Sequence, residues 1–286
     1  MAALRGALAL LLLAPLQVPQ PPTFTVGVAN VSVDVLVTRG GRPVEALRAG
    51  DFALKDNGVP QQVEVLERST TTVDAVLVLD VSSSVRGERL TALRQAAHAF
   101  VDALWPADSV TLLAFATDLR LVARAAAPRL EVHAAIDRLD GAGATTLVDA
   151  VYTGLTLTDP RRGRPLVVVF SDGVDRGSWL TPEAVLSTAK ASDAVVHYVE
   201  VEGALAFLEP VANATGGDGW SARRADGLRG AFVEALEEFK SRYRLRYEPV
   251  GVPRDGWHEL DVRLVGRKGK VRARPGYLVP GARGAR

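Results

Sequence analysis

A short run of oxygen-bearing side chains follows the most apolar segment of the chain. Asp80, Ser82 and Ser84 form a D-x-S-x-S motif at the end of the run VDAVLVLD, just before a helical pattern begins. One carboxylate and two hydroxyls offer hard oxygen ligands to a hard cation such as Mg²⁺. Taken alone, the motif also fits a simpler reading, because serines before a helix often cap it and an aspartate there complements the helix dipole.

Two further segments favour a metal site over simple helix capping. Thr145 lies in the glycine-rich loop GAGATTL, before another helical pattern, and Asp172 follows the buried strand pattern PLVVVFS. Ligands of open α/β sheets bind beyond the carboxyl ends of the strands, so these loops should meet at one edge. Ser83 or Thr146 would serve instead if the register differs by one residue. The predicted metal ligands are Asp80, Ser82, Ser84, Thr145 and Asp172.

This set of residues resembles the metal-ion-dependent adhesion site of von Willebrand factor A domains, over about residues 73–239. In that family a D-x-S-x-S motif, a loop threonine and a late aspartate share one cation. The resemblance implies Mg²⁺, with Mn²⁺ or Ca²⁺ as substitutes, and a protein partner that donates an Asp or Glu carboxylate to it. It also implies an adhesion or protein-interaction module without enzymatic activity. The flanks resemble exported bacterial proteins related to von Willebrand factor A.

The remaining pattern predicts how these loops are positioned. From residue 73 onward, buried strand patterns alternate with helical patterns, which is typical of a doubly wound α/β fold with a mostly parallel sheet. Residues 23–69 and the chain after Tyr243 read as short strands that cannot bury an apolar face alone. We expect the two flanks to pair into a small β-sandwich in which the α/β domain is inserted. The predicted segments are a signal peptide (1–20), an N-terminal β segment (21–70), the von Willebrand factor A domain (71–241) and a C-terminal β segment (242–286) that pairs with 21–70.

Composition and charge restrict the function further. The 286 residues carry a net charge of +1, which makes nucleic acid a poor candidate partner, and the absence of cysteine excludes thiolate chemistry and disulfides. The apolar run near the N-terminus is typical of a signal peptide and too short to span a bilayer. We therefore expect a secreted, periplasmic or envelope-located protein that does not span the membrane in its mature form.

Other candidate residues are better explained by structural or solvent-exposed roles. The four histidines lack a spacing that puts two imidazoles on one helix face, so we interpret them as structural. Asp149 fits either support of the metal or orientation of a helix start, and Asp175 fits a solvated loop. Lys270, Arg272 and Arg274 alternate along a strand and predict a solvated face. Two functional alternatives stay open, a metal-dependent hydrolase and an assembly component of an envelope complex.

Overall fold

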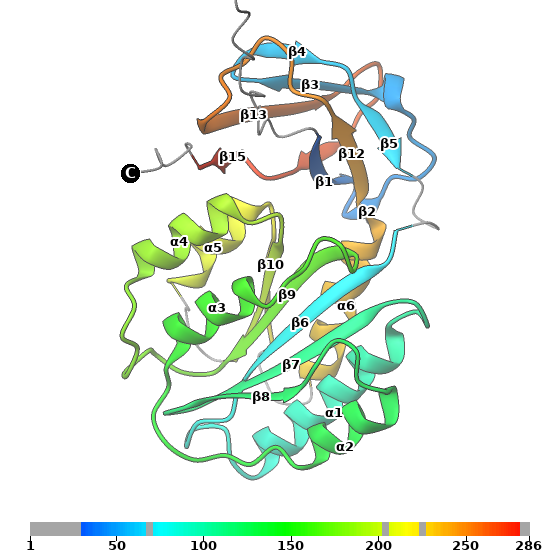
Figure 1. Cartoon of the computed structure of the whole chain (residues 1–286). Helices are drawn as coiled ribbons and strands as arrows, with labels where there is room; N and C mark the ends of the chain where they lie inside the picture. The colour runs from blue at the N-terminus through cyan, green and yellow to red at the C-terminus, as the bar shows by residue number, and fades with distance from the viewer. Residues whose placement is uncertain (1–29, 67–70, 202–205, 223–226, 281–286) are drawn as a thin grey trace, which may run out of the picture.

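The structure is a computed structural model that describes residues 30–66, 71–201, 206–222 and 227–280. It consists of an α/β domain and a β-sandwich that contains both ends of the described chain (Figure 1). The predicted signal peptide, residues 1–20, lies outside the described residues. None of the helices in the described ranges combines the length and apolarity needed to cross a membrane.

The α/β domain is built on a six-stranded sheet with the order β11-β10-β9-β6-β7-β8. All neighbours are parallel except β7 and β8, which form an antiparallel edge. The two central strands, β6 and β9, are buried along their whole length, as their unbroken apolar runs require. The strands are β6 (Val73–Asp80), β7 (Ser109–Phe115), β8 (Leu119–Ala123), β9 (Arg164–Ser171), β10 (Val195–Glu200) and β11 (Gly219–Ser221).

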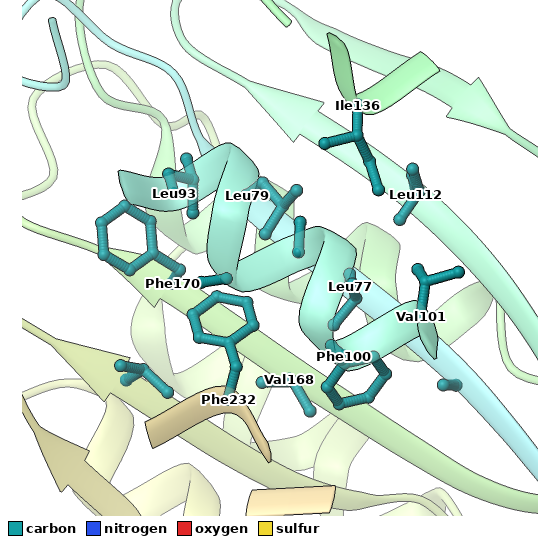
Figure 2. Packing of buried hydrophobic residues seen from close by; sticks show 14 of the residues in the cluster. Leu77, Leu79, Leu93, Phe100, Val101, Leu112, Ile136, Val168, Phe170 and Phe232 are labelled. Carbon is teal, nitrogen blue, oxygen red and sulfur yellow. The ribbon is translucent and has the colours of Figure 1, made fainter. Parts of the chain in front are cut away.

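Helices cover both faces of this sheet. Figure 2 shows the face under α1, where Phe100 packs over the sheet beside Phe232 of α6. Their rings meet edge to face with centroids 6.4 Å apart. One face carries α1 (Glu88–Ala103), α2 (Arg129–Asp137) and α6 (Leu228–Ser241), and the other carries α3 (Leu147–Thr156), α4 (Pro182–Ala191) and α5 (Leu208–Thr215).

The β-sandwich is formed by the two flanks of the chain. One sheet has the order β14-β1-β12-β5, with β2 added to β1, and the other has the order β15-β13-β3-β4. Each sheet therefore combines strands from before and after the α/β domain, and their inner faces share one apolar core. The strands are β1 (Val31–Arg39), β2 (Arg42–Pro43), β3 (Phe52–Asp56), β4 (Val59–Gln61), β5 (Glu64–Leu66), β12 (Tyr243–Tyr247), β13 (Gly256–Leu264), β14 (Lys270–Arg272) and β15 (Gly276–Val279); a 3₁₀ turn, Ala49–Asp51, precedes β3.

The predicted fold class is thereby confirmed: a doubly wound, mostly parallel sheet is inserted in a β-sandwich made from the N- and C-terminal flanks. The domain boundaries themselves stay predictions. The expected solvated face at Lys270, Arg272 and Arg274 is wrong at Arg274, which is buried and donates to the Lys190 carbonyl at 3.0 Å. Arg272 is half-buried and donates to the Gly217 carbonyl at 3.0 Å. Both arginines contact the α/β domain.

A buried ion pair joins the sandwich to the α/β sheet. Arg164, at the start of β9, donates through Nε and Nη2 to Oδ1 of Asp34 in β1, at 2.8 and 2.5 Å. Its guanidinium also lies 4.4 Å from the ring centroid of Phe239 in α6. Because this pair lies at the amino end of β9, it fixes the end of the sheet opposite the candidate site.

Candidate metal centre

Two loops meet at the carboxyl edge of the sheet, the loop after β6 and the loop before α3. The Ala142 N–H donates to the Val81 carbonyl at 2.9 Å, and the Ser83 N–H donates to the Gly143 carbonyl at 3.0 Å. A Cβ on Gly141 would lie 2.7 Å from the Val85 carbonyl oxygen, so the close approach of the loops requires glycine there. The backbone thus holds the D-x-S-x-S segment against the loop that carries the predicted threonine.

A chain of hydroxyls links this segment to the end of β9. The Ser82 and Ser84 hydroxyl oxygens are 3.0 Å apart, and the Ser84 hydroxyl donates to Oδ1 of Asp172 at 2.7 Å. Asp172 follows Ser171, the last residue of β9. The structure therefore brings three of the predicted ligands together across 88 positions of sequence.

Asp80 is fully buried next to these hydrogen-bonded hydroxyls, and its own hydrogen-bond donors are neutral. Its Oδ1 accepts from the Ser82 N–H at 2.8 Å and its Oδ2 accepts from the Ser171 hydroxyl at 2.6 Å. Burial raises the pKa of the Asp80 carboxyl, and hydrogen bonds from Ser171 and Ser82 only partly oppose this. A divalent cation beside Asp80 would compensate the buried charge that these donors leave.

Thr145 is brought to the same place from the loop before α3. A Cβ on Gly173 would lie 3.4 Å from Thr145 Oγ1 and 3.7 Å from Ser84 Oγ, so the two hydroxyls flank this glycine. Thr145 is 6% exposed. Its hydroxyl therefore lies in a nearly buried position beside Gly173, on the same side as the Ser84 hydroxyl.

The hydroxyls of Ser83 and Thr146, next to the predicted ligands, form hydrogen bonds with the backbone. Ser83 Oγ accepts from the Gly143 N–H at 3.0 Å, and the Thr146 hydroxyl donates to the Ala116 carbonyl at 2.8 Å. Both bonds tie loops together at the sheet edge. Their geometry favours the register with Ser82, Ser84 and Thr145 over the register shifted by one residue.

One charged neighbour was not found from the sequence. Arg89, in the first turn of α1, contacts Oδ2 of Asp172 through Nη1 at 2.7 Å, while Oδ1 of Asp172 accepts from Ser84. The Asp172 side chain is fully buried and that of Arg89 is 35% exposed. The only available signal was the position of Arg89, one helical turn beyond the D-x-S-x-S motif. A cation bound here would share Asp172 with the guanidinium.

Asp149 and Asp175 make loop contacts that the sequence did not predict. Asp149 accepts from the N–H groups of Trp179 and Leu180, both at 2.9 Å, so it anchors the loop between β9 and α4. Asp175 is half-buried in this loop, and its Oδ1 accepts from the Ser178 hydroxyl at 2.5 Å and from the Val148 N–H at 3.2 Å. Together the two carboxylates fasten this loop to the start of α3.

The anchored loop exposes apolar side chains beside the candidate site. Trp179 is 95% exposed and Val174 is 70% exposed. Val174 lies two residues after Asp172 in sequence, and Trp179 is held by the Asp149 contact. The loop that follows Asp172 therefore exposes two large apolar side chains.

The donor set suits a hard cation with several water ligands. In the described ranges, no cluster of three or more His, Cys, Asp or Glu side chains could hold a metal ion. The site combines two carboxylates with three hydroxyls, and Mg²⁺ binds proteins through one or two carboxylates while it keeps several waters. The residues Asp80, Ser82, Ser84, Thr145 and Asp172 therefore fit such an ion.

Comparisons with known proteins agree with the fold of the α/β domain. Residues 75–174 match the family described as von Willebrand factor type A domain. No curated protein matches the chain. Residues 75–174 are therefore similar to a von Willebrand factor type A domain, and the predicted resemblance is confirmed.

Solved structures show the same fold. A von Willebrand factor type A protein from Catenulispora acidiphila is 15% identical, with a TM-score of 0.53 over 86% of this chain and 76% of its own. Proximal thread matrix protein 1 from the mussel byssus, described with a zinc-occupied MIDAS motif, is 17% identical, with a TM-score of 0.54 over 67% of this chain and 50% of its own. The domain of the type V pili tip protein Mfa5 from Porphyromonas gingivalis is 12% identical, with a TM-score of 0.50 over 59% of this chain and 96% of its own.

Proposed function

We propose that this protein is a non-enzymatic adhesion or protein-interaction module that binds a partner's carboxylate through a divalent metal ion. The observation that carries the proposal is the buried Asp80, which lies among neutral donors at the edge where the Ser84–Asp172 hydrogen bond joins two strand ends. The residues that would hold the ion are Asp80, Ser82, Ser84, Thr145 and Asp172.

The charges of these residues suit the recognition of an anion. When bound, the cation supplies an electrophilic coordination position that an Asp or Glu carboxylate of another protein can fill. Three of the five proposed ligands are neutral hydroxyls, and Asp172 shares its charge with Arg89. The protein therefore neutralises the ion only in part, which favours an anionic partner.

Support for the metal and the setting comes from the comparisons. The mussel protein is described with zinc in its MIDAS motif, and Mfa5 is described as a pilus tip protein. We propose Mg²⁺ as the ion, with Mn²⁺, Ca²⁺ and Zn²⁺ as substitutes, since oxygen ligands separate these ions weakly. The N-terminal leader pattern supports an exported protein that acts in the periplasm, at the cell envelope or outside the cell.

The rim of the site gives the partner an apolar contact. Trp179 presents a large, fully exposed ring close to the loop that carries Asp172, and exposed aromatic side chains frequently become the most important contacts of interfaces. We propose that the partner packs an apolar surface on Trp179 and Val174 while its carboxylate reaches the metal.

The proposal is tested by recovery of a partner from an extract of the source cells. Immobilised wild-type protein in Mg²⁺ should retain a protein that is lost on addition of chelator and lost with the Asp172→Ala variant. Asp255→Ala, which changes an exposed aspartate in the sandwich, is the matched control and should behave as wild type. Equal recovery in all arms would contradict the proposal, and so would metal-dependent hydrolysis that Asp80→Ala abolishes.

A further inference from the structure

Two helices on one face of the sheet carry the same short pattern of ligand-forming residues. The helix α1 contains His98 and Asp102, and α2 contains His133 and Asp137, each pair four residues apart. Residues at this spacing lie on one side of a helix, one turn apart. The helices lie side by side (Figure 1), and the two patterns face each other.

The imidazoles meet at one ring nitrogen each. His98 Nδ1 lies 2.7 Å from His133 Nδ1, and the rings meet edge to edge, with centroids 5.0 Å apart and an interplanar angle of 17°. The other ring nitrogens face carboxylates of the opposite helix. His98 Nε2 lies 2.9 Å from Asp137 Oδ1, and His133 Nε2 lies 3.3 Å from Asp102 Oδ1.

The carboxylates determine where the ring protons lie. A carboxylate only accepts, so each Nε2 facing one carries a proton that it donates. A neutral imidazole with its proton on Nε2 has its lone pair on Nδ1. Both Nδ1 lone pairs therefore point at each other, and without a further ligand they can share a single proton between them.

We propose that His98 and His133 form a second metal site, which binds a transition-metal ion of the Zn²⁺, Ni²⁺ or Cu²⁺ class through the two Nδ1 atoms, with water as the remaining ligands. Ligating histidines usually donate their other ring N–H to a carboxylate, which is the role of Asp137 and Asp102 here. Imidazole ligands favour these ions over Mg²⁺ and Ca²⁺.

An ion would require a modest rearrangement of the two rings. Two ligand nitrogens at about 2.0–2.1 Å from a tetrahedral ion lie about 3.3 Å apart, so the Nδ1 atoms must separate by roughly 0.6 Å and the rings must turn until both lone pairs meet at the ion. Both histidine side chains are 29% exposed, which lets water complete the coordination. The ion replaces the shared proton, so binding releases a proton to the solvent.

This site is distinct from the candidate metal centre in residues and in ligand chemistry. It has nitrogen ligands from the middle of α1 and from α2, whereas the candidate metal centre has oxygen ligands from loops after β6 and β9 and before α3. An ion bound here would link α1 to α2. Its presence or absence does not depend on the proposed adhesion function.

The test is a titration of the full chain with Zn²⁺ in excess Mg²⁺, followed by the ring ¹H–¹⁵N signals of the histidines. Zn²⁺ should shift the His98 and His133 signals together and leave those of the buried His197 and His258 unchanged. In calorimetry, the measured heat should vary with the ionisation heat of the buffer, because a proton is released.

Variants separate the ligands from their supporting carboxylates. His98→Gln and His133→Gln should each weaken this Zn²⁺ site at least tenfold, and Asp102→Asn combined with Asp137→Asn should weaken it about tenfold. Glu131→Gln, an exposed carboxylate on α2, is the control and should bind as wild type. Circular dichroism spectra of all variants check that they fold. Unchanged Zn²⁺ affinity in His98→Gln, or Zn²⁺ shifts that spare His98 and His133, would overturn the proposal.

Discussion

Asp34 and Asp80 are both buried aspartates, but they lie among opposite kinds of neighbours. Asp34, at the joint between the sandwich and the α/β sheet, receives two bonds from Arg164 at 2.8 and 2.5 Å and lies 3.6 Å from Arg244. Asp80, at the other end of the sheet, accepts from neutral donors, the Ser171 hydroxyl and the Ser82 N–H.

The pKa values of the two carboxyls shift in opposite directions as a result. Burial raises the pKa of both, but at Asp34 the positive charges of Arg164, Arg244 and Arg242 outweigh burial and the pKa is lowered. At Asp80 the neutral donors do not outweigh burial, and the pKa is raised. The first aspartate is neutralised within the fold and serves structure, whereas we infer that the second depends on a cation from solution and serves binding.

Neutralising each carboxyl should separate these roles most strongly. Asp34→Asn leaves the buried Arg164 without its counter-charge and should lower the free energy of unfolding by about 3 kcal/mol. In chelator, Asp80→Asn should cause no such loss, because it removes a buried charge that no cation compensates. Urea unfolding of wild type and both variants measures this difference. A comparable loss of stability for Asp80→Asn would show that Asp80, like Asp34, serves structure.

The pH dependence of stability should also differ in sign. A lowered pKa stabilises the fold above the ordinary value of 3.8, so the stability gap between wild type and Asp34→Asn should persist at pH 7 and close as pH falls below about 4. A raised pKa penalises the charged form above 3.8, so metal-free wild type should gain stability relative to Asp80→Asn as pH falls toward that value. Unfolding of the three proteins in chelator at a series of pH values measures both gaps. If the stability of wild type relative to each variant changes in the same direction as pH falls, the two carboxyls do not differ in the sign of their pKa shifts.

A smaller effect is expected at Arg89, whose guanidinium contacts the Asp172 carboxylate. Its charge is partly screened by solvent and repels a metal ion that shares Asp172. Arg89→Met should therefore strengthen Mg²⁺ binding about threefold, which corresponds to roughly 0.7 kcal/mol. Calorimetry with Mg²⁺ measures the change. Weaker binding in the variant would show that Arg89 instead holds Asp172 in position for the ion.

The fold was predictable where local pattern and burial agree. The apolar runs of β6 and β9 revealed two fully buried strands, and the helical periods located α1 and α3 closely. The strand β11 was missed, because its three residues, Gly219–Ser221, lie in a glycine-rich stretch without any alternation. The contacts of Arg272 and Arg274 were also missed, since a basic strand face gives no sign of the domain packed against it.

For the site, the sequence predicted which residues follow the strand ends, and the parallel sheet places them at one edge. It could not reveal the pairing of His98 with His133, because they lie 35 residues apart on different helices. It also could not show that Asp149 and Asp175 fasten the loop that exposes Trp179. Such contacts arise from tertiary packing and have no local period or spacing.

The central claim is that Asp80, Ser84 and Asp172 hold a divalent ion, and Mn²⁺ binding followed by electron paramagnetic resonance tests it most directly. Wild type should bind one Mn²⁺ at this site that Mg²⁺ displaces. Asp172→Ala and Ser84→Ala should lose it, and the matched control Ser83→Ala, whose hydroxyl only accepts from the Gly143 N–H, should keep it. Unchanged Mn²⁺ binding by folded Ser84→Ala and Asp172→Ala would contradict the account.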